Sequence, residues 1–257
     1  RAFLVFHFIL FPPLRRTAQV SMHIHSFVEH ELLSANQLNP ADFARALALI
    51  GRHDVDYADI YCQRTAYESW HLEEGMVKSG SFQIDQGVGV RAVSGDKTAF
   101  AYADNLTASA LNEAAAAVRA IGQAGQARHV AVAPAATAMP LYVAENPIAS
   151  LDAAAKVALL QKLEAQARAA DPRVVQVMAG LVCEHDLIYL TRLDGRSHAD
   201  VRPLVRLSLT VIAQQGGRRE QGSAGGCGRF DLAYFDEACL QAYVDTAVKQ
   251  ALANLEA

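Results

Sequence analysis

The chain has 257 residues, of which 52% are hydrophobic and 19% are charged, and this balance is typical of a globular protein with one large or two ordinary domains. Nucleic-acid binding requires a clustered basic face, and a net charge of -4 gives no sign of one, so we expect no nucleic-acid partner. The apolar run at residues 2–12 is too short for a bilayer, which needs about 20 apolar residues, so we expect no membrane association.

Residues 1–21 differ in character from the rest of the chain. Arg15 and Arg16 follow the apolar run, whereas a secretory signal peptide begins with its positive charge. Met22 then opens a segment that has the composition of an ordinary start. We therefore expect residues 1–21 to be a non-native leader and Met22 to be the true first residue, with a signal peptide as the alternative.

The first predicted helix begins near residue 40. Asn39 is suited to accept a hydrogen bond from the first turn, Pro40 fits the first helical position, and Gly51 ends the helix. The expected buried stripe is Phe43, Leu47 and Ile50.

After this helix the apolar pattern changes to a period of two. Ser94-Gly95-Asp96-Lys97 predicts a hairpin turn, because glycine readily adopts the positive φ that such turns require. Gly87 and Gly89 lack the third glycine of a dinucleotide-binding fingerprint, and inside a strand they predict close packing against another backbone. The predicted strands are residues 57–63, 67–73, 81–93 and 98–104, with breaks at Gly75, Gly80 and Gly95.

A second helix is predicted over residues 106–121. Thr107 is its expected cap, and the expected buried residues are Leu111, Ala114, Val118 and Ile121, before Gly122. Residues 123–148 are rich in alanine, glycine and proline, which predicts a connecting segment laid over the surface.

The remainder repeats this order of elements. A helix is expected after Ser150, with Leu151, Ala155, Leu159 and Leu163 inward, ending near Asp171-Pro172. Strands are expected over residues 174–183, 187–193 and 205–211. The final helix, residues 236–255, is expected to bury Leu240, Val244, Ala247, Ala251 and Leu255.

These elements predict an α+β fold of two-layer units, each with helices on an antiparallel sheet. They fit either two α+β units or one sheet built from two related halves. The expected organisation is a leader at 1–21, a first α+β domain at 22–128, a linker at 129–148 and a second α+β domain at 149–257.

The histidines give no metal site by spacing. His30-Glu31 begins like a zinc-protease motif, but Ser34 and Ala35 stand where the second histidine of H-E-x-x-H or H-E-x-x-x-H is needed. His23, His25 and His30 are therefore expected at the surface, with a metal role as the alternative. Cys183-Glu184-His185 supplies only two ligands, and we expect a turn there.

Other patterns have ordinary structural interpretations. The glycine-rich residues 216–229 lack the phosphate-loop order and predict a flexible hairpin, or an edge that another backbone approaches closely. Glu73-Glu74, Asp194 and Asp200 are expected to be strand-end and turn charges, and Trp70 and the methionines to serve the core. The cysteines, Cys62, Cys183, Cys227 and Cys239, are widely spread, which favours reduced, mostly buried thiols in a cytoplasmic protein.

Three segments nevertheless carry a family resemblance. Tyr67-Glu68-Ser69-Trp70, the block at residues 85–102, and residues 218–230 resemble the TldD/PmbA metalloprotease family, and the first two resemble its TldD branch more than its PmbA (TldE) branch. The resemblance covers roughly residues 22–257.

The resemblance implies a cytoplasmic, zinc-dependent peptidase that pairs with a homologous PmbA/TldE-like subunit lacking the metal. It implies cleavage of unfolded peptides, including precursors of modified peptide antibiotics; members have also been labelled modulators of DNA gyrase. The family's metal-binding H-E-x-x-x-H motif has no counterpart up to Ala257. We therefore assign no catalytic, cofactor-binding or metal-binding residue here and expect this chain alone to be inactive and free of zinc. The alternative is a noncatalytic module that binds a peptide or a partner subunit.

Overall fold

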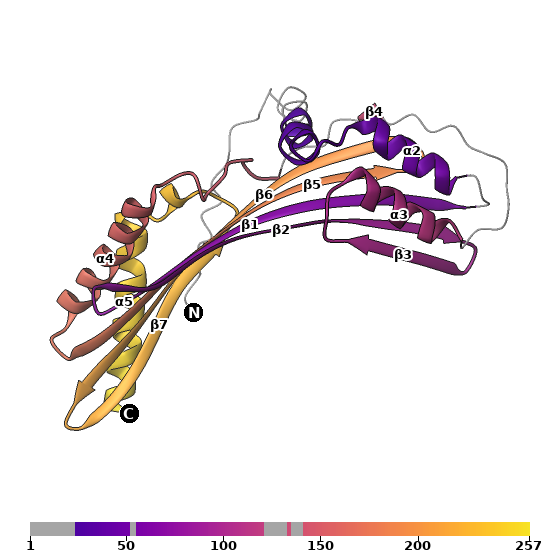
Figure 1. The fold of residues 1–257 in the computed structure, drawn as a ribbon. Helices are drawn as coiled ribbons and strands as arrows, with labels where there is room; N and C mark the ends of the chain where they lie inside the picture. The colour runs from indigo at the N-terminus through magenta and orange to yellow at the C-terminus, as the bar shows by residue number, and fades with distance from the viewer. Residues whose placement is uncertain (1–23, 52–54, 121–132, 135–140) are drawn as a thin grey trace, which may run out of the picture.

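The computed structural model describes residues 24–51, 55–120, 133–134 and 141–257. Within them the strands form one seven-stranded sheet, in the order β3-β2-β1-β5-β6-β4 with β7 also paired to β6. Figure 1 shows a long, twisted sheet with α2 and α3 at one end and α4 and α5 at the other. The strands are β1 Tyr57–Glu73, β2 Met76–Ser94, β3 Lys97–Ala103, β4 Ala133–Pro134, β5 Val174–Arg192, β6 Arg196–Gln215 and β7 Arg218–Gly228. The helical segments are η1 Glu29–Leu33, η2 Ser34–Asn36, α2 Pro40–Ile50, α3 Ala108–Arg119, α4 Ala153–Ala170, η3 Leu232–Tyr234 and α5 Glu237–Glu256.

The strands are longer than the sequence predicts. β1 and β5 pair antiparallel from Asp59 opposite Arg192 to Glu73 opposite Met178, so the predicted interruptions within each strand are wrong. Gly80 also fails to break β2, because it pairs with Trp70 inside the ladder. Neighbouring strands hold these polar and glycine positions in the extended conformation through their hydrogen bonds. The local sequence of one strand does not indicate which strands will pair with it. The hairpin turn at residues 94–97 is confirmed, with Gly95 at φ 54°.

Helices cover one face of the sheet in two places. The first core lies beneath η1, α2 and α3, and its sheet residues include Ile60 of β1, Val90 of β2 and Tyr189 of β5. Phe43 of α2 packs edge-on against Tyr189, with 5.3 Å between ring centroids. This core therefore combines strands from both halves of the sequence.

The second core lies beneath α4 and α5 at the other end of the sheet. It contains Leu72 of β1 together with Leu181 of β5 and Leu207 of β6, and all three are fully buried. Since β1 and β5 contribute to both cores, a single sheet connects the two predicted halves, and the α+β class is confirmed. The division at residues 128 and 149 stays a proposal about how the chain is organised.

Helix ends follow the expected chemistry in most places. The Asn39 side chain accepts from the Ala41 amide at 3.0 Å, and the Asn39 amide donates to Asp42 at 2.8 Å. Thr107 caps α3, as predicted, by accepting from the Ala110 amide at 3.2 Å. The predicted buried residues of α5 are also confirmed.

The predictions for α4 need correction. Asp152, and not Ser150, caps this helix, because Ser150 donates its hydroxyl to the Pro147 carbonyl instead. The buried stripe is Lys156, Leu160, Leu163, Glu164 and Ala167, which includes the predicted Leu163. The predicted Leu151 and Leu159 are only half-buried but do pack against the second core.

The connecting segment is described only in part. Ala133–Pro134 forms β4, which pairs parallel with the start of β6. Leu141 is 90% exposed, and the Tyr142 hydroxyl donates to Asp200 at 3.2 Å. Leu141 therefore lies at the surface, as the composition of this segment predicts. The leader, Met22, His23, Ile121 and Gly122 lie outside the described residues.

Candidate functional site

A groove of about 460 Å³ lies on the sheet face opposite the first core. Directly opposed residues in antiparallel strands share a face. Tyr61 of β1 pairs with Gly89 of β2, which pairs in turn with Tyr102 of β3, so these residues share the face that the helices leave uncovered. The groove is lined by Tyr61, Gln63 and Thr65 of β1, residues 85–89 of β2, Phe100, Tyr102 and Ala103 of β3, and Asp104.

Aromatic rings form one wall of this groove. Phe100 and Tyr102 are 64% and 79% exposed and stack with ring centroids 6.2 Å apart. Gly89 lies directly beneath the Phe100 ring, since a β-carbon there would be 3.1 Å from it, a tight contact that a small shift of this exposed ring relieves. At Gly87 a β-carbon would lie 2.7 Å from the Ala103 carbonyl oxygen. The predicted backbone approach is therefore correct for Gly87, whereas Gly89 packs against a side chain.

A chain of hydrogen bonds forms the polar floor of the groove. The Tyr61 hydroxyl donates to Gln63 at 2.9 Å, and the Gln63 amide donates to Thr65 at 3.0 Å. Thr65 donates to a carboxylate oxygen of Asp186, a buried residue of β5, at 2.6 Å. Partial burial raises the pKa of the Tyr61 hydroxyl, so it stays protonated and able to donate near neutral pH. The floor thus holds fixed polar groups between exposed rings.

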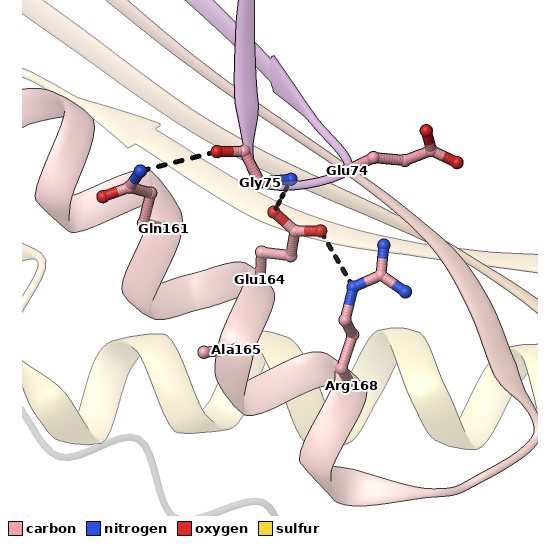
Figure 2. A pocket seen from close by; sticks show the side chains of 6 residues that line it. All are labelled: Glu74, Gly75, Gln161, Glu164, Ala165 and Arg168. Carbon is pink, nitrogen blue, oxygen red and sulfur yellow. Dashed lines mark hydrogen bonds and ion pairs between the residues drawn. The ribbon is translucent and has the colours of Figure 1, made fainter.

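A second hollow lies where the β1–β2 hairpin meets α4 (Figure 2). Glu164 accepts from the Gly75 amide at 2.6 Å and from the Arg168 side chain at 2.9 Å. Gln161 donates to the Gly75 carbonyl at 3.4 Å, and Glu74 at the hairpin tip adopts a left-handed φ of 53°. Figure 2 shows Glu164 between Gly75 and Arg168. We interpret this arrangement as an anchor for the hairpin, because Glu164 of α4 binds the Gly75 amide and is itself held by Arg168.

A buried ion pair lies further along α4. The Lys156 ammonium donates to Glu68 at 2.5 Å and to the Ile148 carbonyl at 2.6 Å, and both charged residues are buried. The Trp70 indole donates to the other Glu68 oxygen at 2.9 Å. Sequence analysis missed this ion pair, because a lysine on a helix is usually at the surface.

The prediction that Trp70 and the methionines serve the core is only partly correct. Trp70 packs against the second core, whereas Met76 is 57% exposed.

The predicted histidine positions are only partly correct. His30 is exposed and lies 3.0 Å from Glu31, whereas His25 is largely buried and its ring hydrogen-bonds to Ser197 at 3.0 Å. Cys183 and His185 lie within β5 and not in a turn, so that prediction is wrong. Burial lowers the pKa of His185 and raises that of Cys183 to about 12. Among the described residues, no three His, Cys, Asp or Glu side chains lie together as a metal site.

The glycine-rich segment, the turn aspartates and the cysteines all have structural positions outside the groove. Residues 218–228 form edge strand β7, and a β-carbon at Gly222 would collide with the Ala247 carbonyl of α5, which fits the predicted close approach. Asp194 pairs with Arg192 in the β5–β6 turn, but Asp200 lies inside β6 and pairs with Arg202. All four cysteines are free; Cys62 and Cys183 are buried, whereas Cys227 is exposed and Cys239 half-buried, so the thiols are less buried than expected.

Two family models match the chain. Residues 58–122 match domain 1 of the PmbA/TldA metallopeptidases, and residues 146–255 match their central domain. The chain is 41% identical over 237 residues to a protein named Metalloprotease TldD homolog from Haemophilus influenzae, a match that covers 90% of this chain and 49% of that protein. The homologue of the same name from Buchnera aphidicola subsp. Schizaphis graminum is 35% identical over 235 residues, covering 89% and 49%. The chain therefore spans about half the length of these relatives.

Solved structures share the fold at lower sequence identity. A putative modulator of a DNA gyrase from Thermotoga maritima has a TM-score of 0.64 and 18% identity, covering 82% of this chain and 47% of that one. TldE from Thermococcus kodakarensis has a TM-score of 0.60 and 14% identity, with coverages of 82% and 47%. At these identities the likeness concerns the fold alone. In the described residues, no helix is long and apolar enough to cross a bilayer.

Proposed function

The chain belongs to the PmbA/TldD metallopeptidase family, and on this premise we propose that it is the amino-terminal scaffold of a TldD-type, zinc-dependent peptidase. In this proposal it holds unfolded peptide substrates and docks a homologous PmbA/TldE-like subunit in the cytoplasm. The observation that carries the proposal is the match of 90% of this chain to about half of a TldD homologue. The four free thiols support a reducing compartment.

The described residues do not fit a catalytic zinc site. Such a site needs about three protein ligands that converge on one point with a further position open. No such group occurs in the described residues, and His30-Glu31 lacks a second histidine one turn later. We therefore assign the metal chemistry to the part of the longer relatives that this chain does not match, and no catalytic step to the residues described.

The groove supports a peptide-holding role for this part. It is lined by residues of three strands, and its floor offers the Tyr61, Gln63 and Thr65 side chains as fixed hydrogen-bonding groups. Exposed rings at Phe100 and Tyr102 give apolar area without the entropy cost of ordering long side chains. An unfolded chain has unpaired backbone amides and exposed apolar side chains, and this surface complements both.

A docked subunit is the second part of the proposal. The sheet edge formed by the first part of β2 extends beyond the reach of β3, since β3 pairs only with residues 88–94. Exposed apolar side chains lie along this stretch, including Val77, Phe82 and Ile84. Long edges with exposed apolar side chains are suited to pairing with another chain. A noncatalytic binding module is the alternative function, and it would use the same surfaces without a metal-bearing partner.

Zinc content and peptide cleavage test this proposal. The purified chain should hold no stoichiometric zinc and cleave no unfolded peptide. A fusion of the chain to the unmatched half of the Haemophilus influenzae TldD homologue, with a PmbA/TldE-like subunit present, should bind zinc and cleave the peptide. A chelator should abolish this cleavage. Chelator-sensitive cleavage by the chain alone would contradict the assignment, and an inactive, zinc-free fusion would favour the noncatalytic module.

A further inference from the structure

The groove carries negative charge without any positive charge, and the proposed peptide-holding role does not explain this excess. Its lining includes the carboxylates of Asp85 and Asp104 and contains no lysine, arginine or histidine. Neither carboxylate has an ion-pair partner among the described residues. The groove is therefore an anionic surface beside exposed aromatic rings.

A third carboxylate lies behind the floor of the groove. Asp186 is 8% exposed and accepts hydrogen bonds from Thr65 at 2.6 Å and from Gln63 at 3.3 Å. Within the part of the chain that the structure describes, it too has no ion-pair partner. Its hydrogen bonds offset the cost of burial, while its negative charge adds to the field that a cation entering the groove would meet.

The cations nearest to the groove are already neutralised. Arg91 stands opposite Phe100 in the β2–β3 ladder, but its guanidinium pairs with Asp59 and lies over the Tyr57 ring. Arg202 stands opposite Asp186 in the β5–β6 ladder, but its guanidinium pairs with Asp200 at 2.7 Å. These pairs leave the carboxylates of the groove free to attract an external cation.

We propose that this groove binds a basic side chain, arginine or lysine, of an extended peptide segment. The cation lies against the Phe100 and Tyr102 rings, where the ring face attracts it, and within reach of the Asp85 and Asp104 carboxylates. The strand edges and the polar floor hold the flanking backbone. The inference rests on the proposed function, because it names the class of peptide that the scaffold prefers, and it makes the groove selective for basic segments over neutral or acidic ones.

Matched peptides test the proposal by calorimetric titration of the full chain. One unfolded peptide carries a single arginine, and its twin carries citrulline, which keeps the shape and removes the charge. The arginine peptide should bind about tenfold more tightly at low salt, and the difference should shrink as salt is added. Asp85→Asn with Asp104→Asn should abolish the difference, whereas Asp245→Asn with Glu256→Gln, which removes two negative charges on α5 away from the groove, should keep it.

The outcomes separate this inference from the proposed function. Equal binding of both peptides would overturn the basic preference and leave peptide holding intact, whereas binding of neither would overturn both. Arginine amide that binds as tightly as the peptide would overturn the extended-peptide assignment. A dimer that Tyr102→Ala dissociates, with no change in peptide binding, would show that a second copy occupies the groove and would contradict the proposal.

Discussion

The two ends of the sheet are covered by helices in the same way but are stabilised differently. At the first end, the core consists of apolar side chains and the Phe43–Tyr189 ring pair, and the buried carboxylates of Asp42 and Asp59 pair with exposed arginines. At the second end, Lys156, Glu68 and Glu164 are buried where α4 crosses the sheet. Apolar packing tolerates small changes of shape, whereas a buried charge depends on one partner in one place. The second end is therefore the end at which a single substitution has the larger effect on stability.

The uncovered face differs between the ends as well. At the first end it carries the groove with its exposed rings and unpaired carboxylates. At the second end the neighbouring strands carry paired polar groups, such as Arg219 with Gln176 and Gln176 with Glu73. The difference fits the proposed peptide contact at the first end and a more rigid second end.

The largest expected effect is the loss of the buried ammonium. Lys156→Met leaves Glu68 charged and buried, and the free energy of unfolding should fall by about 3–5 kcal/mol. Urea unfolding of both proteins measures the change. Lys162→Met on the same helix is the control, because Lys162 and Glu237 are both largely exposed and their pair is worth about 0–1 kcal/mol. Equal effects of the two changes would show that the buried pair has no special role.

The hairpin anchor should give a smaller effect. Glu164→Gln keeps the shape but weakens the bonds from the Gly75 amide and the Arg168 side chain, and should cost about 1–3 kcal/mol. Hydrogen exchange should speed up most at the tip of the β1–β2 hairpin. An unchanged exchange rate at residues 74–76 would mean that α4 does not hold the hairpin.

In the first core, the loss of stability should depend only on the side-chain volume that a substitution removes. Ile60→Val removes one methylene from a fully buried position and should cost about 0.5–1.5 kcal/mol. The same denaturation measurement applies, and the value should not change with pH, because no charge is involved. A loss as large as that of Lys156→Met would remove the contrast between the two ends.

The smallest effect concerns His185, which lies on β5 between the two cores. Its pKa is lowered by burial first and then by Arg64, while Asp186 and Glu31 oppose the shift. The unfolded chain therefore binds a proton at His185 more readily than the folded chain does. The contribution of neutral His185 to the free energy of unfolding is present above about pH 6.5 and is lost as pH falls through the pKa of the folded state. His185→Gln should flatten that part of the stability profile. A profile that is identical in both proteins would contradict this assignment.

Sequence reasoning predicted the local features of this fold and missed those that depend on distant partners. The Asn39 and Thr107 caps and the buried stripe of α5 follow from spacing alone. Lys156 was missed because its partner, Glu68, lies 88 positions earlier in the sequence.

The groove was missed for a related reason. Gly87 and Gly89 marked a close approach, but only the register of three strands brings Tyr61 and Tyr102 to the same face. A local signal did exist in the alternation of aromatic residues along 100–102, whose exposed side was not identified. The interrupted strands were predicted wrongly because pairing, and not local propensity, keeps Arg64 and Asp186 extended.

Hydrogen exchange with a bound peptide tests the peptide-holding role of the first end most directly. An unfolded peptide of mixed composition is added to the full chain, and amide protection is compared with that of the free chain. Slower exchange should appear at residues 61–65, 85–89 and 100–104 and be absent from α4 and α5. Protection confined to α4 and α5, or no protection anywhere, would contradict the assignment of peptide contact to the groove.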